Sequence, residues 1–100
     1  MMNILFHKEI DKLKRQILAM SAKVENDVAT AVRAADNLDS SAAQIVINRE
    51  MQTNIMEVDV EEECLKILAL YQPVASDLRY IIDVLKINQD LERIGDLAEM

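Results

Sequence analysis

The sequence predicts an all-α protein folded as an up-down-up antiparallel three-helix bundle, and three observations support this fold class. The 100 residues include one Gly, one Pro and three aromatic residues, which leaves little material for tight turns or a packed sheet. Apolar residues recur at alternating spacings of three and four, as along the seam of a helical bundle. Two segments interrupt this pattern and divide the chain into helices expected at about 4–38, 40–71 and 74–100.

The first predicted helix has the clearest pattern. Neither Gly nor Pro occurs between residues 4 and 38. Its apolar seam comprises Phe6, Ile10, Leu13, Ile17, Met20 and Val24. The segment Asp-Asn-Leu-Asp-Ser-Ser at 36–41 gathers turn formers and helix-capping side chains, so the chain is expected to reverse there and to start the second helix near Ser40.

The second and third predicted helices are separated by Pro73, which lacks an amide hydrogen and biases Gln72 away from helical dihedrals. The seam of the second helix is traced through Ile47, Met51, Val58, Leu65 and Leu68, widened by Cys64 and Ile67. The seam of the third begins with Val74, Leu78, Ile81 and Leu85. Because no stop signal precedes residue 100, the third helix is predicted to be truncated, and the chain to be one three-helix unit.

Composition excludes several classes of function. The net charge of −7 makes nucleic acid and anionic membrane surfaces poor partners. The sequence shows neither a signal peptide nor an apolar run long enough to span a membrane, so a cytoplasmic location without membrane insertion is expected. Cys64 is the only cysteine, which fits a reducing compartment. The single histidine, His7, is interpreted as a surface residue, and without a nucleophile beside a base no enzymatic activity is predicted.

All three seams turn polar at a similar height. Continuing the first past Val24 leads to Asp27, and continuing the third past Leu85 leads through Asn88 to an acidic segment. If the chain reverses near residues 40 and 72, residues 27 and 92 both fall level with about residue 52. The residues expected to share this layer are Asp27, Glu50, Asn54, Glu92 and Asp96.

Gathered carboxylates repel one another unless protons, basic side chains or a cation compensate their charge. An all-oxygen ligand set suits Mg²⁺, Mn²⁺ or Ca²⁺, and carboxylate-rich sites also bind iron. Two alternatives need no metal: Arg93 or another basic side chain could pair with these acids, and an acid pair four residues apart occurs by chance in many helices. Gly95, within the same turn, would admit either a ligand or a closely packed helix.

Two strings near the second break and in the third helix are much more specific than any acid pair. The strings Gln-Pro-Val-Ala-Ser-Asp-Leu-Arg at 72–79 and Glu-Arg-Ile-Gly-Asp at 92–96, together with the opening Phe-His-Lys-Glu-Ile at 6–10 and Met20, resemble the PhoU family over nearly the whole chain. The resemblance implies two tandem three-helix repeats, of which this chain would be the first. It also implies a non-catalytic cytosolic protein that negatively regulates phosphate-responsive signalling between the phosphate transporter ATPase and a sensor histidine kinase, and that forms homodimers.

Acidic motifs of this family bind metal clusters, and the resemblance places them at Glu92 to Asp96 and at Glu50 to Asn54. Asn54 departs from the family pattern because an amide replaces an acid, so the second half-site is expected to bind more weakly. The predicted function is therefore a metal-binding regulator of phosphate uptake. The alternative is a metal-free helical scaffold that binds a basic or helical partner protein.

Overall fold

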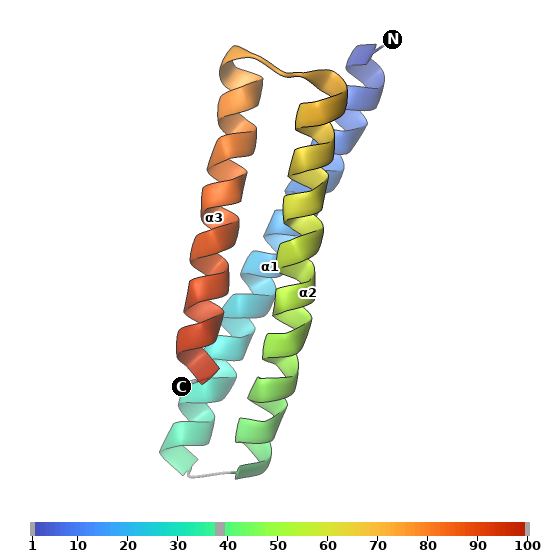
Figure 1. Cartoon of the computed structure of the whole chain (residues 1–100). Helices are drawn as coiled ribbons and strands as arrows, with labels where there is room; N and C mark the ends of the chain where they lie inside the picture. The colour runs from blue at the N-terminus through green and yellow to red at the C-terminus, as the bar shows by residue number, and fades with distance from the viewer. Residues whose placement is uncertain (1, 38–39, 100) are drawn as a thin grey trace.

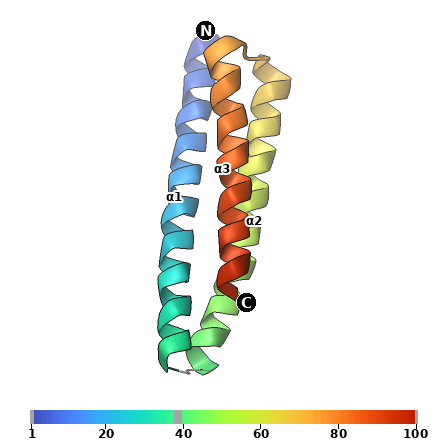
Figure 2. The ribbon, with the colours of Figure 1, turned by 90° about the vertical axis from the view of Figure 1, so that its left-hand side faces the viewer.

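Three long helices run side by side in the computed structural model and form the predicted all-α bundle (Figures 1 and 2). Helix α1 spans Met2–Asn37, α2 Ser40–Tyr71 and α3 Ala75–Glu99. The structure describes the backbone over 2–37 and 40–99, and side chains over 4–33, 35–36, 48–49 and 51–95. The bundle measures 55 × 18 × 16 Å, and α3 ends before the level of the turn between α1 and α2.

Helix α1 faces the core with the predicted seam. Leu13, Ile17, Met20 and Val24 are buried, and the two seam residues before them, Phe6 and Ile10, are half-buried. One apolar stripe on an otherwise polar helix leaves a single way to turn it toward its neighbours. Its pattern therefore determines its orientation in the bundle.

Helix α2 is turned differently from the prediction. Met51, Val58 and Leu65, expected in the seam, are 64%, 47% and 53% exposed, and Leu68 is half-buried. The residues that face the core are Thr53, Val60, Glu63, Cys64 and Ile67. The expected Ile47 lies outside the described side chains. The prediction is confirmed for Cys64 and Ile67 and was wrong for Met51, Val58 and Leu65. Helix α2 carries apolar residues on two opposite faces, and spacing alone does not tell them apart.

The break between α2 and α3 lies where Pro73 predicts it. Gln72 has a φ of 44°, and its amide donates to Leu68 O at 3.2 Å, so a left-handed residue caps the end of α2. Ala75 also has a positive φ, 53°, and the Asp77 amide donates to Val74 O at 3.2 Å to close the first turn of α3. This conformation leaves Val74 73% exposed, against its expected place in the third seam.

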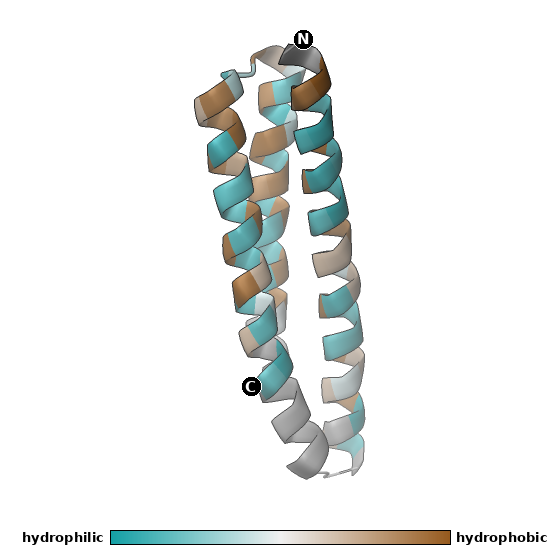
Figure 3. Ribbon diagram, turned by 90° about the vertical axis from the view of Figure 1, so that its right-hand side faces the viewer, coloured by the Kyte–Doolittle hydropathy of each residue, from teal (hydrophilic) through white to brown (hydrophobic). Residues whose placement is uncertain are grey.

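The main core fills the half of the bundle nearer the α2–α3 loop. On α3, Ile81 and Val84 are buried, and Leu85 packs half-buried beside them. The complete buried cluster comprises Leu13, Ile17, Val60, Cys64, Ile67, Ile81 and Val84. Hydrophilic and hydrophobic residues alternate along the helices, as expected for helices that each contact two neighbours (Figure 3).

Candidate functional site

Beyond Val24 the buried interior becomes polar. Four polar residues from all three helices are buried there: Asp27 and Thr30 on α1, Thr53 on α2 and Asn88 on α3, with exposed fractions of 0–9%. We call these four residues the polar layer. Because a buried polar group is costly unless it is hydrogen-bonded, their partners determine what this end of the bundle can do.

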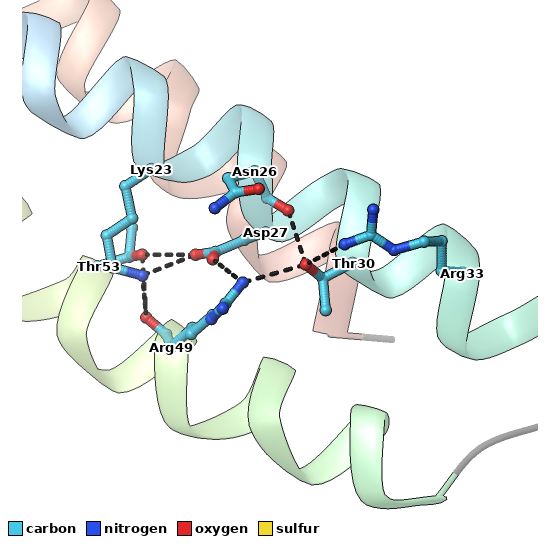
Figure 4. Close-up of polar contacts among 7 residues, drawn as sticks. All are labelled: Lys23, Asn26, Asp27, Thr30, Arg33, Arg49 and Thr53. Carbon is cyan, nitrogen blue, oxygen red and sulfur yellow. Dashed lines mark hydrogen bonds and ion pairs between the residues drawn. The ribbon is translucent and has the colours of Figure 1, made fainter.

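Asp27 lies at the centre of a network that joins α1 to α2 (Figure 4). The Lys23 ammonium donates to Asp27 Oδ2 at 2.8 Å and to Arg49 O at 2.9 Å. The Arg49 guanidinium lies 3.6 Å from Asp27 Oδ1. Thr53 Oγ1 lies 3.3 Å from Asp27 Oδ2 and 3.1 Å from Arg49 O, and its one proton can be donated to either oxygen. Both oxygens of the Asp27 carboxylate thus face a cation.

Thr30 extends this network toward the α1–α2 turn. Its hydroxyl donates to Asn26 O at 2.9 Å and accepts from Arg49 Nη1 at 3.0 Å and Arg33 Nη2 at 3.3 Å (Figure 4). The oxygen of one hydroxyl therefore positions two guanidinium groups. Arg49 makes contacts with both Asp27 and Thr30, so its side chain is held from two successive turns of α1.

Asp27 is thereby charge-balanced by the protein itself. Its side chain is 7% exposed, and those of Lys23 and Arg49 are 18% and 35% exposed. Removing one partner of such a desolvated pair is costly because the remaining charge stays buried. The prediction that residue 27 lies level with about residues 51–53 is confirmed by the Thr53 contact, while the neighbours of Asp27 are cations rather than acids.

Asn88 sets the register of α3 on α2. Its Nδ2 donates to Glu57 O at 2.9 Å. Its Oδ1 is buried and accepts no hydrogen bond from any residue in the described part of the chain. In an antiparallel pair aligned at 88 and 57, residue 92 falls level with about residue 53 and residue 96 with about residue 49. The acidic segment of α3 thus runs alongside the segment of α2 that holds Glu50 and Asn54.

The five predicted site residues therefore have different surroundings. Asp27 is buried, Glu92 is half-buried and Asn54 is exposed. The side chains of Glu50 and Asp96 lie outside those the structure describes. Among the described side chains, no three His, Cys, Asp or Glu residues are placed to hold a metal ion together. Gly95, next to Glu92 on α3, is buried, so the absence of a side chain there permits close helix packing.

A second ionic cluster lies beside the apolar core, where the sequence analysis expected nothing. Glu63 is 5% exposed, and its Oε2 lies 3.3 Å from Lys12 Nζ and 3.1 Å from Lys66 Nζ. Lys66 Nζ is also 2.7 Å from Glu9 Oε2. Hydrogen bonds with Glu63 and then with Lys66 hold the pKa of Glu9 below its ordinary value. Opposite charges from α1 and α2 alternate here, so the cluster joins the two helices.

Cys64 is buried beside this cluster. Desolvation, followed by the negative charges of Glu63 and Glu61, raises the pKa of the Cys64 thiol to about 11. The thiol is therefore neutral near physiological pH and contributes to packing as a small apolar group. The sequence analysis placed Cys64 beside the apolar seam of the second helix, and the side chain does lie in the buried apolar cluster.

Sequence reasoning missed the partners of Asp27. Lys23, one turn earlier on the same helix, could have been identified from its spacing of four residues. Arg49 and Thr53 could not, because they depend on the orientation of α2, which the apolar pattern left ambiguous. None of the helices described between residues 2 and 99 is long and apolar enough to cross a membrane.

Comparison with known proteins agrees with this architecture. The sequence model of the PhoU domain matches residues 17–100. The chain is 40% identical over 94 residues to the phosphate-specific transport system accessory protein PhoU of Serratia marcescens, a match covering 94% of this chain and 39% of that protein. It is 47% identical over 93 residues to a homolog of that protein from Pseudomonas putida, covering 93% of this chain and 36% of the homolog.

A homolog from Aquifex aeolicus is 39% identical over 92 residues, covering 92% of this chain and 42% of that protein. The chain spans about two fifths of the length of the curated relatives that it matches. Since the domain model matches most of the chain, and the three-helix arrangement is the one that the resemblance implied, the chain belongs to the PhoU family.

Proposed function

We propose that this chain is a metal-binding, non-catalytic regulatory unit of phosphate uptake, acting as an adaptor between the phosphate transporter ATPase and a sensor histidine kinase. Relatives with the same domain are named accessory proteins of the phosphate-specific transport system. In this role the unit would couple the state of the transporter to the kinase and would repress phosphate-starvation signalling when phosphate is plentiful.

The observation that carries the metal part of the proposal is the register of α3 on α2. The bond from Asn88 Nδ2 to Glu57 O brings the Glu92–Asp96 segment alongside the Glu50–Asn54 segment. Carboxylate and amide oxygens are the ligands that Mg²⁺, Mn²⁺ and iron accept. The half-buried Glu92 and the unsatisfied Oδ1 of Asn88, one turn apart on α3, fit a site of this kind.

The proposed ligand set is Glu92 and Asp96 on α3 with Glu50 and Asn54 on α2. Asp27 is left out because Lys23 and Arg49 already neutralise it. A cation bound by the proposed set would offset the repulsion between acids four residues apart and would stabilise the contact of α3 with α2. Metal binding would thereby couple to the stability of the bundle.

A thermal unfolding series tests this. Titrating Mn²⁺ should raise the melting temperature, since a ligand at 100 times its Kd adds about 2.7 kcal/mol to the folded state. The double variant Glu92→Ala/Asp96→Ala should lose this rise. The control Asp59→Ala/Glu61→Ala removes the same charge from exposed positions of α2 and should keep the rise. A melting temperature that stays constant up to millimolar Mn²⁺, Mg²⁺ and iron would refute the metal part.

The regulatory part is tested in cells. The same Glu92→Ala/Asp96→Ala pair, introduced into the natural gene, should raise expression from a phosphate-starvation promoter when phosphate is abundant, while the Asp59/Glu61 control should not. If capture of the transporter ATPase and the kinase persists in chelator while elemental analysis finds no metal, the metal-free scaffold is the correct reading.

A further inference from the structure

The Lys23 ammonium lies against oxygen atoms from both α1 and α2 (Figure 4). Its Nζ donates to Asp27 Oδ2 at 2.8 Å and to Arg49 O at 2.9 Å. Thr53 Oγ1 lies with these two atoms, 3.3 Å from Asp27 Oδ2 and 3.1 Å from Arg49 O. We call the three atoms the oxygen cluster. A carboxylate, a backbone carbonyl and a hydroxyl are oxygen types that bind hard cations in proteins.

The oxygen cluster is withdrawn from water. Asp27 and Thr53 are 5% and 0% exposed, and the Lys23 side chain is 18% exposed. A carboxylate in such surroundings requires a positive charge close by, because its own hydration is lost. Since Lys23 lies one turn before Asp27 on α1, its stem brings the ammonium to the cluster from within the same helix. The ammonium is thus a cation attached to the chain.

The distances around Lys23 indicate what size of ion the oxygen cluster suits. Oxygen ligands lie about 2.0–2.1 Å from Mg²⁺ and about 2.3–2.6 Å from Ca²⁺. The contacts of Lys23 Nζ, at 2.8 and 2.9 Å, are longer than both ranges. The cluster is therefore spaced for a larger ion, of the size of ammonium or potassium.

A second cation beside Asp27 determines the charge that the oxygen cluster suits. The Arg49 guanidinium lies 3.6 Å from Asp27 Oδ1 and is held there by its 3.0 Å contact with Thr30 Oγ1. One carboxylate thus already faces two positive charges. A divalent ion in place of the ammonium would add a further positive charge beside Arg49, whereas a monovalent ion would leave the balance unchanged.

We propose that Asp27 Oδ2, Thr53 Oγ1 and Arg49 O form a site for a large monovalent cation, which Lys23 fills with its own ammonium. Because the ammonium is tethered, the site is occupied without recruiting an ion from solution. The contact between α1 and α2 is then independent of the supply of free cations. This site is separate from the proposed metal site between α2 and α3, and either can be correct without the other.

Emptying the site tests this proposal. Lys23→Ala removes the ammonium and leaves room for an ion, whereas Lys23→Met keeps much of the bulk of the stem without its charge. Melting temperatures are compared in potassium chloride and in tetramethylammonium chloride, whose cation is too large for the site, at equal ionic strength. Lys23→Ala should melt at least about 2 °C higher in potassium chloride, the shift expected for an ion near its Kd. Wild type and Lys23→Met should show no such difference.

Two further variants show where the ion binds. Adding Asp27→Asn to Lys23→Ala removes the charged ligand and should abolish the potassium effect. Lys14→Ala, which removes an exposed lysine of the same helix, should show no potassium effect at all. Ammonium chloride should stabilise Lys23→Ala as potassium chloride does, because the ammonium ion is the free form of the group that was removed.

Four results would overturn the proposal. Lys23→Ala could melt at the same temperature in both salts, or could stay unfolded in potassium chloride by circular dichroism. A potassium effect that persists after Asp27→Asn would place the ion elsewhere. Stronger stabilisation of Lys23→Ala by Mg²⁺ or Ca²⁺ than by potassium would contradict the monovalent assignment. Folding of Lys23→Ala in potassium chloride but not in tetramethylammonium chloride would support the site.

Discussion

The two halves of the bundle interior are built from the same three helices but depend on different forces. Near the α2–α3 loop, Leu13, Ile67 and Ile81 are fully buried in apolar surroundings. Toward the α1–α2 turn, the polar layer replaces them, with Asp27 held by Lys23 and Arg49. Apolar packing tolerates many arrangements, whereas a desolvated ion pair is favourable in only one geometry. The comparison suggests that the first half provides stability and the second fixes position.

The largest expected loss of stability comes from a substitution in the apolar half. Leu13→Ala removes a fully buried side chain from the cluster and leaves a cavity, so the free energy of unfolding should fall by about 3 kcal/mol. Urea denaturation measures this change. Leu18→Ala, on the exposed side of the same helix, should cost less than about 0.5 kcal/mol. Equal losses for the two variants would contradict the assigned orientation of α1.

The next largest loss of stability comes from a substitution in the polar layer. Asp27→Asn leaves Lys23 and Arg49 without their shared counter-charge and should lower the free energy of unfolding by about 2 kcal/mol, less than the figure for a fully buried pair because both cations are partly exposed. Asp90→Asn, which removes the exposed partner of Arg93, is the matched control and should have little effect. An unchanged midpoint for Asp27→Asn would show that the network does not hold α1 to α2.

Lowering the pH tests the ionic cluster beside the apolar core, which also joins α1 to α2. The folded-state pKa of Glu9 is lower than its unfolded value of 4.5, so its contribution is complete above that pH and is lost as pH falls through the folded pKa. The melting temperature should therefore decline as the pH falls below about 4.5. Glu9→Gln should flatten the decline. A wild-type slope retained in this variant would assign the pH dependence to other carboxylates.

The smallest effect belongs to neither half. The pair between Arg93 and Asp90 has side chains that are 72% and 65% exposed at 3.0 Å. Such pairs contribute little because water screens them and ordering two long side chains is unfavourable. Arg93→Ala should change the free energy of unfolding by less than about 0.5 kcal/mol. A larger loss would indicate that Arg93 has a further partner in the folded chain.

The sequence could predict the fold and one helix in detail. The three helices follow from two breaks and uninterrupted periodicity, and the seam of α1 is confirmed because that helix has one apolar stripe. On α2 the spacings of Met51, Val58 and Leu65 equal those of Thr53, Val60 and Ile67, seven residues apart in both sets. Periodicity cannot choose between equal seams, and the outer one was chosen wrongly.

The sequence could predict at which level along the bundle the site lies, but not which side chains meet there. Reversal near residues 40 and 72 placed Asp27 level with about residue 52, and the contact of Asp27 with the Thr53 hydroxyl confirms this level. Which side chains meet at that height depends on rotation of α2, so the cations around Asp27 were missed and Asn54, now found exposed, was assigned to the layer. The metal-binding role of Glu92, Asp96, Glu50 and Asn54 stays a prediction.

The most direct test distinguishes a residue that holds the helices in place from a residue that binds the metal. Its central claim is that Asp27 holds the helices in place while Glu92 binds the ligand. Mn²⁺ titration calorimetry of the folded variants should give Asp27→Asn a Kd within about threefold of wild type. Glu92→Gln should bind at least about tenfold more weakly while retaining stability. Folded Asp27→Asn that no longer binds Mn²⁺, beside Glu92→Gln with unchanged affinity, would contradict the account.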